Sequence, residues 1–182
     1  MTSTTEEKIL ETALKIFAEK GYVAATTKTI STEAGFSEMT LFRKFGNKES
    51  LFEAVLVKYQ EKIVKDFGPI MADEDGKTPR DHLKFLINSL VDLMEENFEY
   101  VNIIIYERKR VSDSITQTFV AHLGEYLEEH FPREKINHKV LAFNILSFIY
   151  FVIFNKKFGS NSFDFEVTVE EFINYNARCL QK

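Results

Sequence analysis

Residues 26–48 hold the side chains best suited to chemistry, because hydroxyl, ammonium and carboxylate groups follow one another there at short intervals. Hydroxyl and ammonium groups donate hydrogen bonds to phosphate oxygens, which position a protein on a nucleic acid without reading its sequence. The candidates for phosphate contacts are Thr26, Thr27, Thr40 and Lys48. The candidates for base edges are Lys28, Ser37, Glu38, Met39 and Lys44. Lysine favours guanine, glutamate accepts from the cytosine amine, and methionine can touch the thymine methyl group.

Two short helices joined by a glycine turn are expected to carry these side chains. Ile30 and Leu41 each lie on the apolar side of one helix, and Phe45 follows Leu41 by four residues. Gly35 supplies the left-handed backbone conformation between the two helices. Thr26 and Ser37 are also expected to cap the helices, and a solvated charge explains Glu38 equally well. A second helix that presents short polar and basic residues suits the major groove of DNA.

This pattern resembles the DNA-binding domain of the TetR (tetracycline repressor) family of transcription regulators. The matching positions are Ile30, Ala34, Gly35, Phe36, Ser37, Thr40, Leu41, Phe42, Phe45, Asn47, Lys48, Leu51 and Phe52, and residues 9–22 are similar to the family's first helix. The family usually has a tyrosine at position 42 whose hydroxyl reaches a phosphate. Phe42 lacks that hydroxyl, so the phosphate contact is expected either to be lost or to be replaced by Arg43 or Lys44.

The resemblance implies an all-α protein with two domains. Residues 1–48 would form a three-helix DNA-binding domain, and residues 49–182 an effector-binding and dimerisation domain that starts with a connecting helix over 49–67. It also implies a homodimer through the last two helices, a palindromic double-stranded DNA operator, and repression relieved by a small apolar effector. The expected walls of the effector pocket are Met94, Phe98, Tyr106, Phe119, Phe143, Asn144 and Ser147. Residues like the first five belong more often to a core than to a pocket, and the last two are equally explained as polar groups of an interface.

Hydrophobic periodicity predicts about nine helices. Thr4 and Glu7 are spaced for a capping box at the first helix. Asn47 is placed to cap the fourth helix, which is expected to end near Pro69. The charged residues 72–79 then form the one obvious linker. The segment 135–158 is expected to be the most apolar helix. Its part over 140–154 is apolar on almost every side, which indicates either a central core helix or one shared between two subunits.

Composition limits the remaining possibilities. The net charge of −5 alone argues against nucleic-acid binding, but Gly21–Lys48 has four basic and two acidic residues, so +2 there leaves −7 elsewhere. Only one cysteine is present, so no internal disulfide can form, and a cytoplasmic location is expected. The longest apolar run, 140–154, is too short to span a bilayer, and no membrane partner is expected.

Catalytic chemistry has little support in the sequence. His122, His130 and His138 recur every eight residues, but Pro132 interrupts the helix between the last two, and no metal-binding pair of histidine and glutamate occurs. Cys179 has no adjacent histidine. We therefore expect no enzyme, cofactor or metal. The alternatives are a helical ligand carrier or protein-interaction module with a degenerate helix-turn-helix and, more distantly, a helical metalloenzyme.

Overall fold

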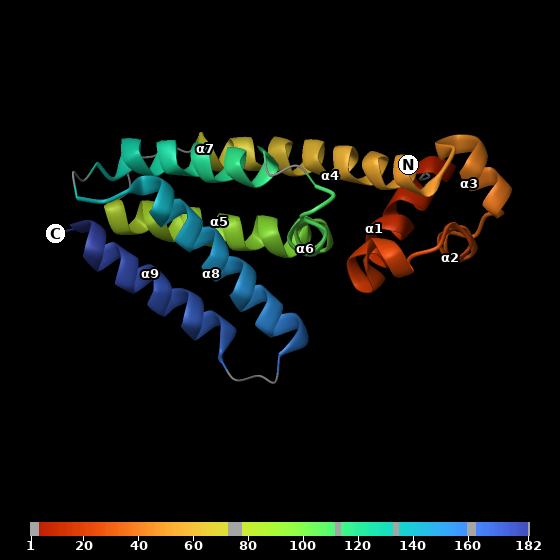
Figure 1. Ribbon diagram of the computed structural model, residues 1–182. Coiled ribbons are helices and arrows are strands. Elements are labelled where there is room, and N and C mark those ends of the chain that lie inside the picture. Colours follow the sequence, from red (N-terminus) through yellow and green to blue (C-terminus); the bar gives the residue numbers. More distant parts are fainter. Residues whose placement is uncertain (1–3, 73–77, 112–113, 133–134, 160–162, 182) are drawn as a thin grey trace. The chain divides into compact units, whose positions relative to one another are not determined.

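The computed structural model describes residues 4–72, 78–111, 114–132, 135–159 and 163–181. Over these ranges the chain forms nine helices and no strands (Figure 1). The helices are α1 (Thr5–Ala24), α2 (Thr27–Glu33), α3 (Glu38–Phe45), α4 (Lys48–Met71), α5 (Pro79–Glu96), α6 (Phe98–Tyr106), α7 (Ser114–His130), α8 (His138–Phe158) and α9 (Phe165–Gln181). The all-α prediction is confirmed.

Side-chain caps set several of the helix starts. The Thr4 hydroxyl accepts from the Glu7 amide at 3.2 Å, and the Glu7 carboxylate accepts from the Thr4 amide at 2.7 Å, which completes the expected capping box. The side-chain carbonyl oxygen of Asn47 accepts from the Ser50 amide at 2.9 Å and caps α4 as expected. Asn137 caps α8 in the same way, so that helix begins at His138 and not at residue 135.

The chain divides into two compact units. Unit 1 comprises residues 1–64 and 97–112, and unit 2 comprises residues 65–96 and 113–182. Helix α4 contributes to both units and continues through Pro69 to Met71, slightly beyond its expected end. Residues 73–77, the centre of the expected linker, lie outside the described residues. The domain boundary after residue 48 stays a prediction, and α6 shares a unit with α1–α3.

Unit 1 is built around α1, which packs against α2 and α6. Phe17, Tyr22 and Phe52 form an aromatic cluster in which the Phe52 ring centre lies 5.0 Å from each of the other two. Gly21 has a φ of 73°, which bends the end of α1. A residue with a β-carbon would strain that backbone, so glycine is required for Tyr22 to enter the cluster.

Unit 2 contains α5, α7, α8 and α9. Helix α8 packs against α7, α5 and α9, and Figure 1 shows α8 and α9 running antiparallel. The rings of Phe148 on α8 and Phe172 on α9 stack with their centres 3.7 Å apart. Lys84 on α5 contacts Glu170 on α9 at 2.9 Å, and this ammonium lowers the pKa of the Glu170 carboxyl. Aromatic stacking and a surface ion pair thus hold α9 against its neighbours.

Helix α8 is longer than the apolar run seen in the sequence. Judged by length and composition, it is the one helix among the described residues that could cross a membrane, with a mean hydropathy of 1.5. A third of that stretch is buried, and α8 packs against three other helices of unit 2. These contacts place one side of α8 in the core of unit 2.

Candidate nucleic-acid interface

Helices α2 and α3 form a helix-turn-helix. The Thr26 hydroxyl accepts from the Thr29 amide at 3.0 Å and caps α2, while the Ser37 hydroxyl accepts from the Thr40 amide at 3.2 Å and caps α3. Gly35 lies between them with a φ of 80°. Both capping predictions are confirmed, and so is the left-handed glycine. The turn therefore has the backbone geometry that the sequence requires.

The two faces of α3 differ sharply. Leu41 is fully buried, and Ile30 of α2 is equally inaccessible to solvent. On the opposite side, Met39 is 80% exposed, Phe42 is 43% exposed, and Arg43 is exposed. Successive helical residues are rotated by about 100°, so these three side chains fall within about one quarter to one third of the helix circumference. We call them the α3 outer surface.

Two charged residues of α3 are held by other helices. Thr27 of α2 donates its hydroxyl hydrogen to a Glu38 carboxylate oxygen at 2.6 Å. The Lys44 ammonium lies 3.5 Å from the Glu6 carboxylate of α1. These contacts fix α3 against its neighbours. They also occupy Glu38 and Lys44, both of which were predicted to contact base edges. Sequence reasoning missed the Glu6 contact because that residue is far away along the chain.

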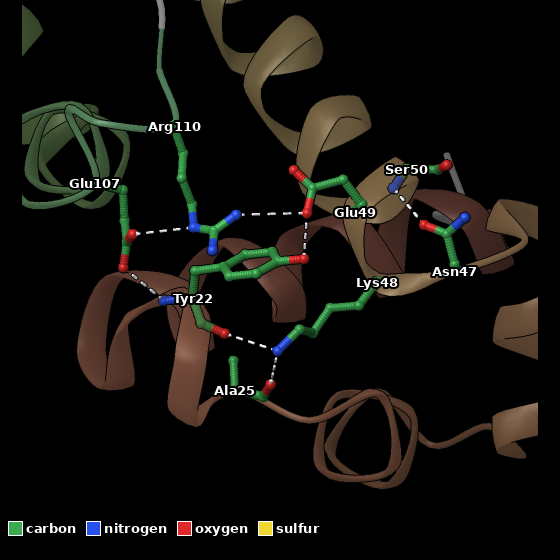
Figure 2. A network of polar contacts seen from close by, with 8 residues as sticks. All are labelled: Tyr22, Ala25, Asn47, Lys48, Glu49, Ser50, Glu107 and Arg110. Atoms are coloured by element: carbon green, nitrogen blue, oxygen red, sulfur yellow. Dashed lines mark hydrogen bonds and ion pairs between the residues drawn. The ribbon is translucent and has the colours of Figure 1, made fainter.

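Lys48 ties the end of α1 to the start of α4. Its ammonium donates to the carbonyl oxygens of Tyr22 and Ala25 at 2.9 and 3.0 Å, as Figure 2 shows. The same nitrogen lies 4.4 Å from the centre of the Tyr22 ring. An ammonium has three N–H donors, so two are used inside the protein and one remains. Its nitrogen also complements the negative carbonyl end of α1.

Tyr22 is the centre of a wider set of polar contacts, which we call the Tyr22 network. The Arg110 guanidinium lies 4.0 Å from the ring centre, and Figure 2 shows it across the ring from Lys48. The Tyr22 hydroxyl donates to Glu49, while the Tyr22 amide donates to Glu107 at 2.7 Å. Burial, followed by the hydrogen bond to Glu49, raises the pKa of the Tyr22 hydroxyl. The network joins α1, α4 and the residues after α6.

Residues 9–55 match the family model described as bacterial regulatory proteins, tetR family. The uncharacterised HTH-type regulator YvkB of Bacillus subtilis is 32% identical over 122 residues, which is 67% of this chain and 59% of YvkB. The chain belongs to the TetR family. Against a second B. subtilis regulator, YerO, the match covers only 35% of that relative. Members of this family are regulators that carry an N-terminal helix-turn-helix.

Solved structures show the same fold over the whole chain. A TetR-like transcriptional regulator from Rhodococcus sp. RHA1 superposes with a TM-score of 0.76 at 16% identity, covering 100% of this chain and 98% of that one. AibR, solved in complex with isovaleryl coenzyme A and operator DNA, gives 0.73 at 17% identity, covering 94% and 97%. The helices of both units of this TetR-family chain therefore have counterparts in known structures.

Two cations of the helix-turn-helix are exposed and lie outside these internal contacts. Lys28 of α2 and Arg43 of α3 form no ion pair within the described part of this TetR-family chain. Lys44 and Lys48, in contrast, have the partners given above. Lys28 and Arg43 can therefore approach a phosphate without breaking a contact, which the sequence alone did not reveal.

The seven side chains expected around an effector pocket belong to both units and differ in exposure. Met94 and Phe98 are buried, Phe119 packs edge-on against Phe67 at 5.2 Å, and Ser147 is half-buried. The exposed members are Tyr106 (64%), Phe143 (56%) and Asn144. An open groove along α5 is lined by other residues, namely Asp81, Lys84, Phe85, Asn88, Ser89 and Asp92. The pocket of this TetR-family chain stays a prediction.

Groups for catalytic chemistry are sparse in the part of the chain that the structure describes. No three His, Cys, Asp or Glu side chains there gather into a metal-binding group, and Cys179 is exposed. His82 and His130 face each other with ring centres 5.0 Å apart, and the His130 ring stacks on Tyr126 at 4.0 Å. These contacts are packing between α5 and α7.

Proposed function

We propose that this chain is a transcriptional repressor that binds a palindromic DNA operator as a homodimer and leaves it when a small apolar effector binds. The observation that carries the proposal is the helix-turn-helix, in which caps and a buried core hold α3 with one face outward. A helix held in this way can enter the major groove with its first turns against base edges. Such a protein acts on the chromosome and therefore in the cytoplasm.

The exposed cations supply the phosphate contacts in this proposal. Lys28 and Arg43 bind phosphates directly, and the hydroxyls of Thr26 and Thr40 add neutral donors. The Thr27 hydroxyl joins them only if it releases Glu38. Lys48 is the first residue of α4, so an anion bound by its remaining N–H is also attracted by the positive end of that helix. Base edges are left to Ser37, Glu38, Met39 and Lys44. Lys28, which the sequence suggested for a base edge, is assigned to a phosphate here. Phe42 contributes no hydrogen bond to a phosphate.

The outward face of α8 supports the homodimer. Val140, Phe143, Phe151 and Phe158 are all exposed. Their spacing places them along one side of the helix, and we call them the α8 stripe. On α9, Val167 and Tyr175 are exposed as well. A large apolar surface of this kind marks an interaction site, and a second copy of the same helices buries it symmetrically.

Dimerisation also follows from what one helix can read. A single recognition helix contacts too few base pairs to select a site, and two helices about 34 Å apart read two half-sites. Effector binding favours one of two dimer shapes. Only the other shape holds the two recognition helices at the spacing of the operator half-sites. The AibR complex, which contains an acyl coenzyme A together with operator DNA, supports an apolar acyl group as the kind of effector.

Selection of bound sequences from random double-stranded DNA tests the proposal. We expect a palindromic site to emerge, and we expect its affinity to fall as salt increases because phosphate contacts release counterions. Recovery of no preferred sequence would overturn the repressor proposal and favour a helical ligand carrier or protein-interaction module. A variant with Lys28→Ala and Arg43→Ala should recover little DNA of any sequence.

A further inference from the structure

The outer surface of α3 presents apolar atoms where sequence readout takes place. Met39 is the second residue of α3 and is 80% exposed, while Phe42 follows one turn later. Helices of this kind contact bases through their N-terminal residues. An exposed methionine adds little to the stability of the free protein, because its side chain buries almost no surface there. Met39 is therefore placed to meet a base and free to do so.

The polar groups around Met39 are committed to contacts inside the protein. Glu38 accepts a hydrogen bond from Thr27 at 2.6 Å. The hydroxyls of Ser37 and Thr40 lie 2.9 Å apart and bond to each other. Each must break or share an existing contact before it reads a base edge, which costs part of the new bond. Met39 meets a base without such a loss.

We propose that Met39 reads the C5 methyl group of a thymine in the major groove. The inference rests on the proposed function and deepens it by naming the chemistry of one base contact. Thymine is the one base with a methyl group on its major-groove edge, so an apolar side chain selects it. The thioether is flexible and polarisable, which lets the side chain follow the surface of the methyl group. Arg43, four residues later, anchors the same face of α3 to a phosphate.

Replacing thymine by deoxyuridine in the selected operator tests the contact directly, because this change removes only the methyl group. Each thymine of one half-site is exchanged in turn, and affinities are measured for the wild type and for Met39→Ala. At one position we expect the wild type to lose about fourfold in affinity, the effect of one buried methyl-sized group. Exchange in both half-sites should lose about sixteenfold, since distant sites act independently.

The Met39→Ala protein should bind the thymine and deoxyuridine operators equally, at the level at which the wild type binds deoxyuridine. Met39→Leu keeps an apolar side chain and should retain most of the discrimination. Val57→Ala serves as the matched control, because Val57 is another exposed apolar residue of unit 1 and lies on α4. This control should respond to deoxyuridine as the wild type does.

Two outcomes would overturn the inference while leaving the proposed function intact. The wild type could bind a selected palindrome and tolerate deoxyuridine at every position, or Met39→Ala could keep the full sensitivity. Failure of the selection to yield any preferred sequence would instead overturn the proposed function. The two failures are therefore distinguishable in the same set of measurements.

Discussion

The α3 outer surface and the α8 stripe both expose large apolar side chains, but the α3 surface also carries Arg43, and the chain surrounds the two differently. The α3 surface is small, and the polar groups beside it are tied by side-chain contacts to Thr27 and Glu6. The α8 stripe extends over most of a 21-residue helix, from Val140 to Phe158. An apolar patch framed by fixed polar groups suits a polar partner such as DNA, and a long apolar stripe suits a copy of itself.

Charges placed in the α8 stripe should produce the largest effect. Phe143→Asp combined with Phe151→Asp would put carboxylates into an apolar interface, where burial of unpaired charge is costly. We expect the protein to become monomeric in analytical ultracentrifugation. Operator affinity should fall by about a hundredfold or more, because the second half-site no longer binds in the same complex. Val57→Asp is the matched control, and it should leave the protein dimeric. If the double mutant remains dimeric, the α8 stripe is not part of the dimer interface.

The next effect concerns the buried hydroxyl of Tyr100 in α6. Tyr100 is fully buried, its hydroxyl oxygen has no hydrogen-bond partner in the described part of the chain, and burial raises the pKa of Tyr100 to about 12. Because the folded pKa exceeds the unfolded value of about 10, the contribution of Tyr100 to stability is constant below pH 10 and is lost as pH rises toward 12. The loss should approach about 3 kcal/mol, measured by denaturant unfolding at each pH.

Tyr100→Phe should reduce that alkaline loss. At neutral pH it should raise the free energy of unfolding by about 1 kcal/mol, because it removes a buried polar group that lacks a partner. Tyr175→Phe is the control, since Tyr175 is exposed on α9 and should change neither quantity. An unchanged alkaline transition in Tyr100→Phe would show that other groups cause it.

The Tyr22 network should make unit 1 sensitive to a single lysine. Lys48→Met removes two hydrogen bonds from a charged donor and one contact with the Tyr22 ring. We expect the free energy of unfolding to fall by about 2 kcal/mol. Lys28→Met, at an exposed position without an ion pair among the described residues, should change stability by less than about 0.5 kcal/mol. Equal effects of the two substitutions would mean that Lys48 has no structural role.

The smallest effect is expected at Phe42. Phe42→Tyr restores the hydroxyl that the family usually places at this position, and the side chain is exposed enough to reach a phosphate. Operator affinity should rise about threefold to tenfold, the range of one additional hydrogen bond. Phe42→Leu lacks the hydroxyl and should not tighten binding. An unchanged or weaker affinity for Phe42→Tyr would refute the idea that a phosphate contact is missing.

Local spacing made much of the helix-turn-helix predictable. Thr4, Ser37 and Asn47 are recognisable as caps because their partners lie three residues away. Gly35 and Leu41 follow from turn chemistry and periodicity in the same way. The sequence thus indicated which side of α3 faces the core, which is the part of the site that depends on neighbouring residues.

Long-range contacts were not predictable from the sequence. The Tyr22 amide and Glu107 are 85 residues apart, and no local pattern links them. The charged run after α6, which contains Glu107 and Arg110, was the one available signal. Lys48 was expected to point at a phosphate, yet most of its donors serve carbonyl oxygens of α1. Side-chain direction depends on tertiary packing, which a single sequence does not encode locally.

One salt titration tests the central claim most directly. Binding of the selected operator and of a scrambled duplex is measured between about 50 and 200 mM salt for the wild type and for Arg43→Ala. We predict that the wild type prefers the operator at every salt concentration. The slope of log affinity against log salt should weaken by about two for the Arg43→Ala dimer, one phosphate per subunit. Equal affinity for both duplexes, or binding that does not respond to salt, would contradict the account.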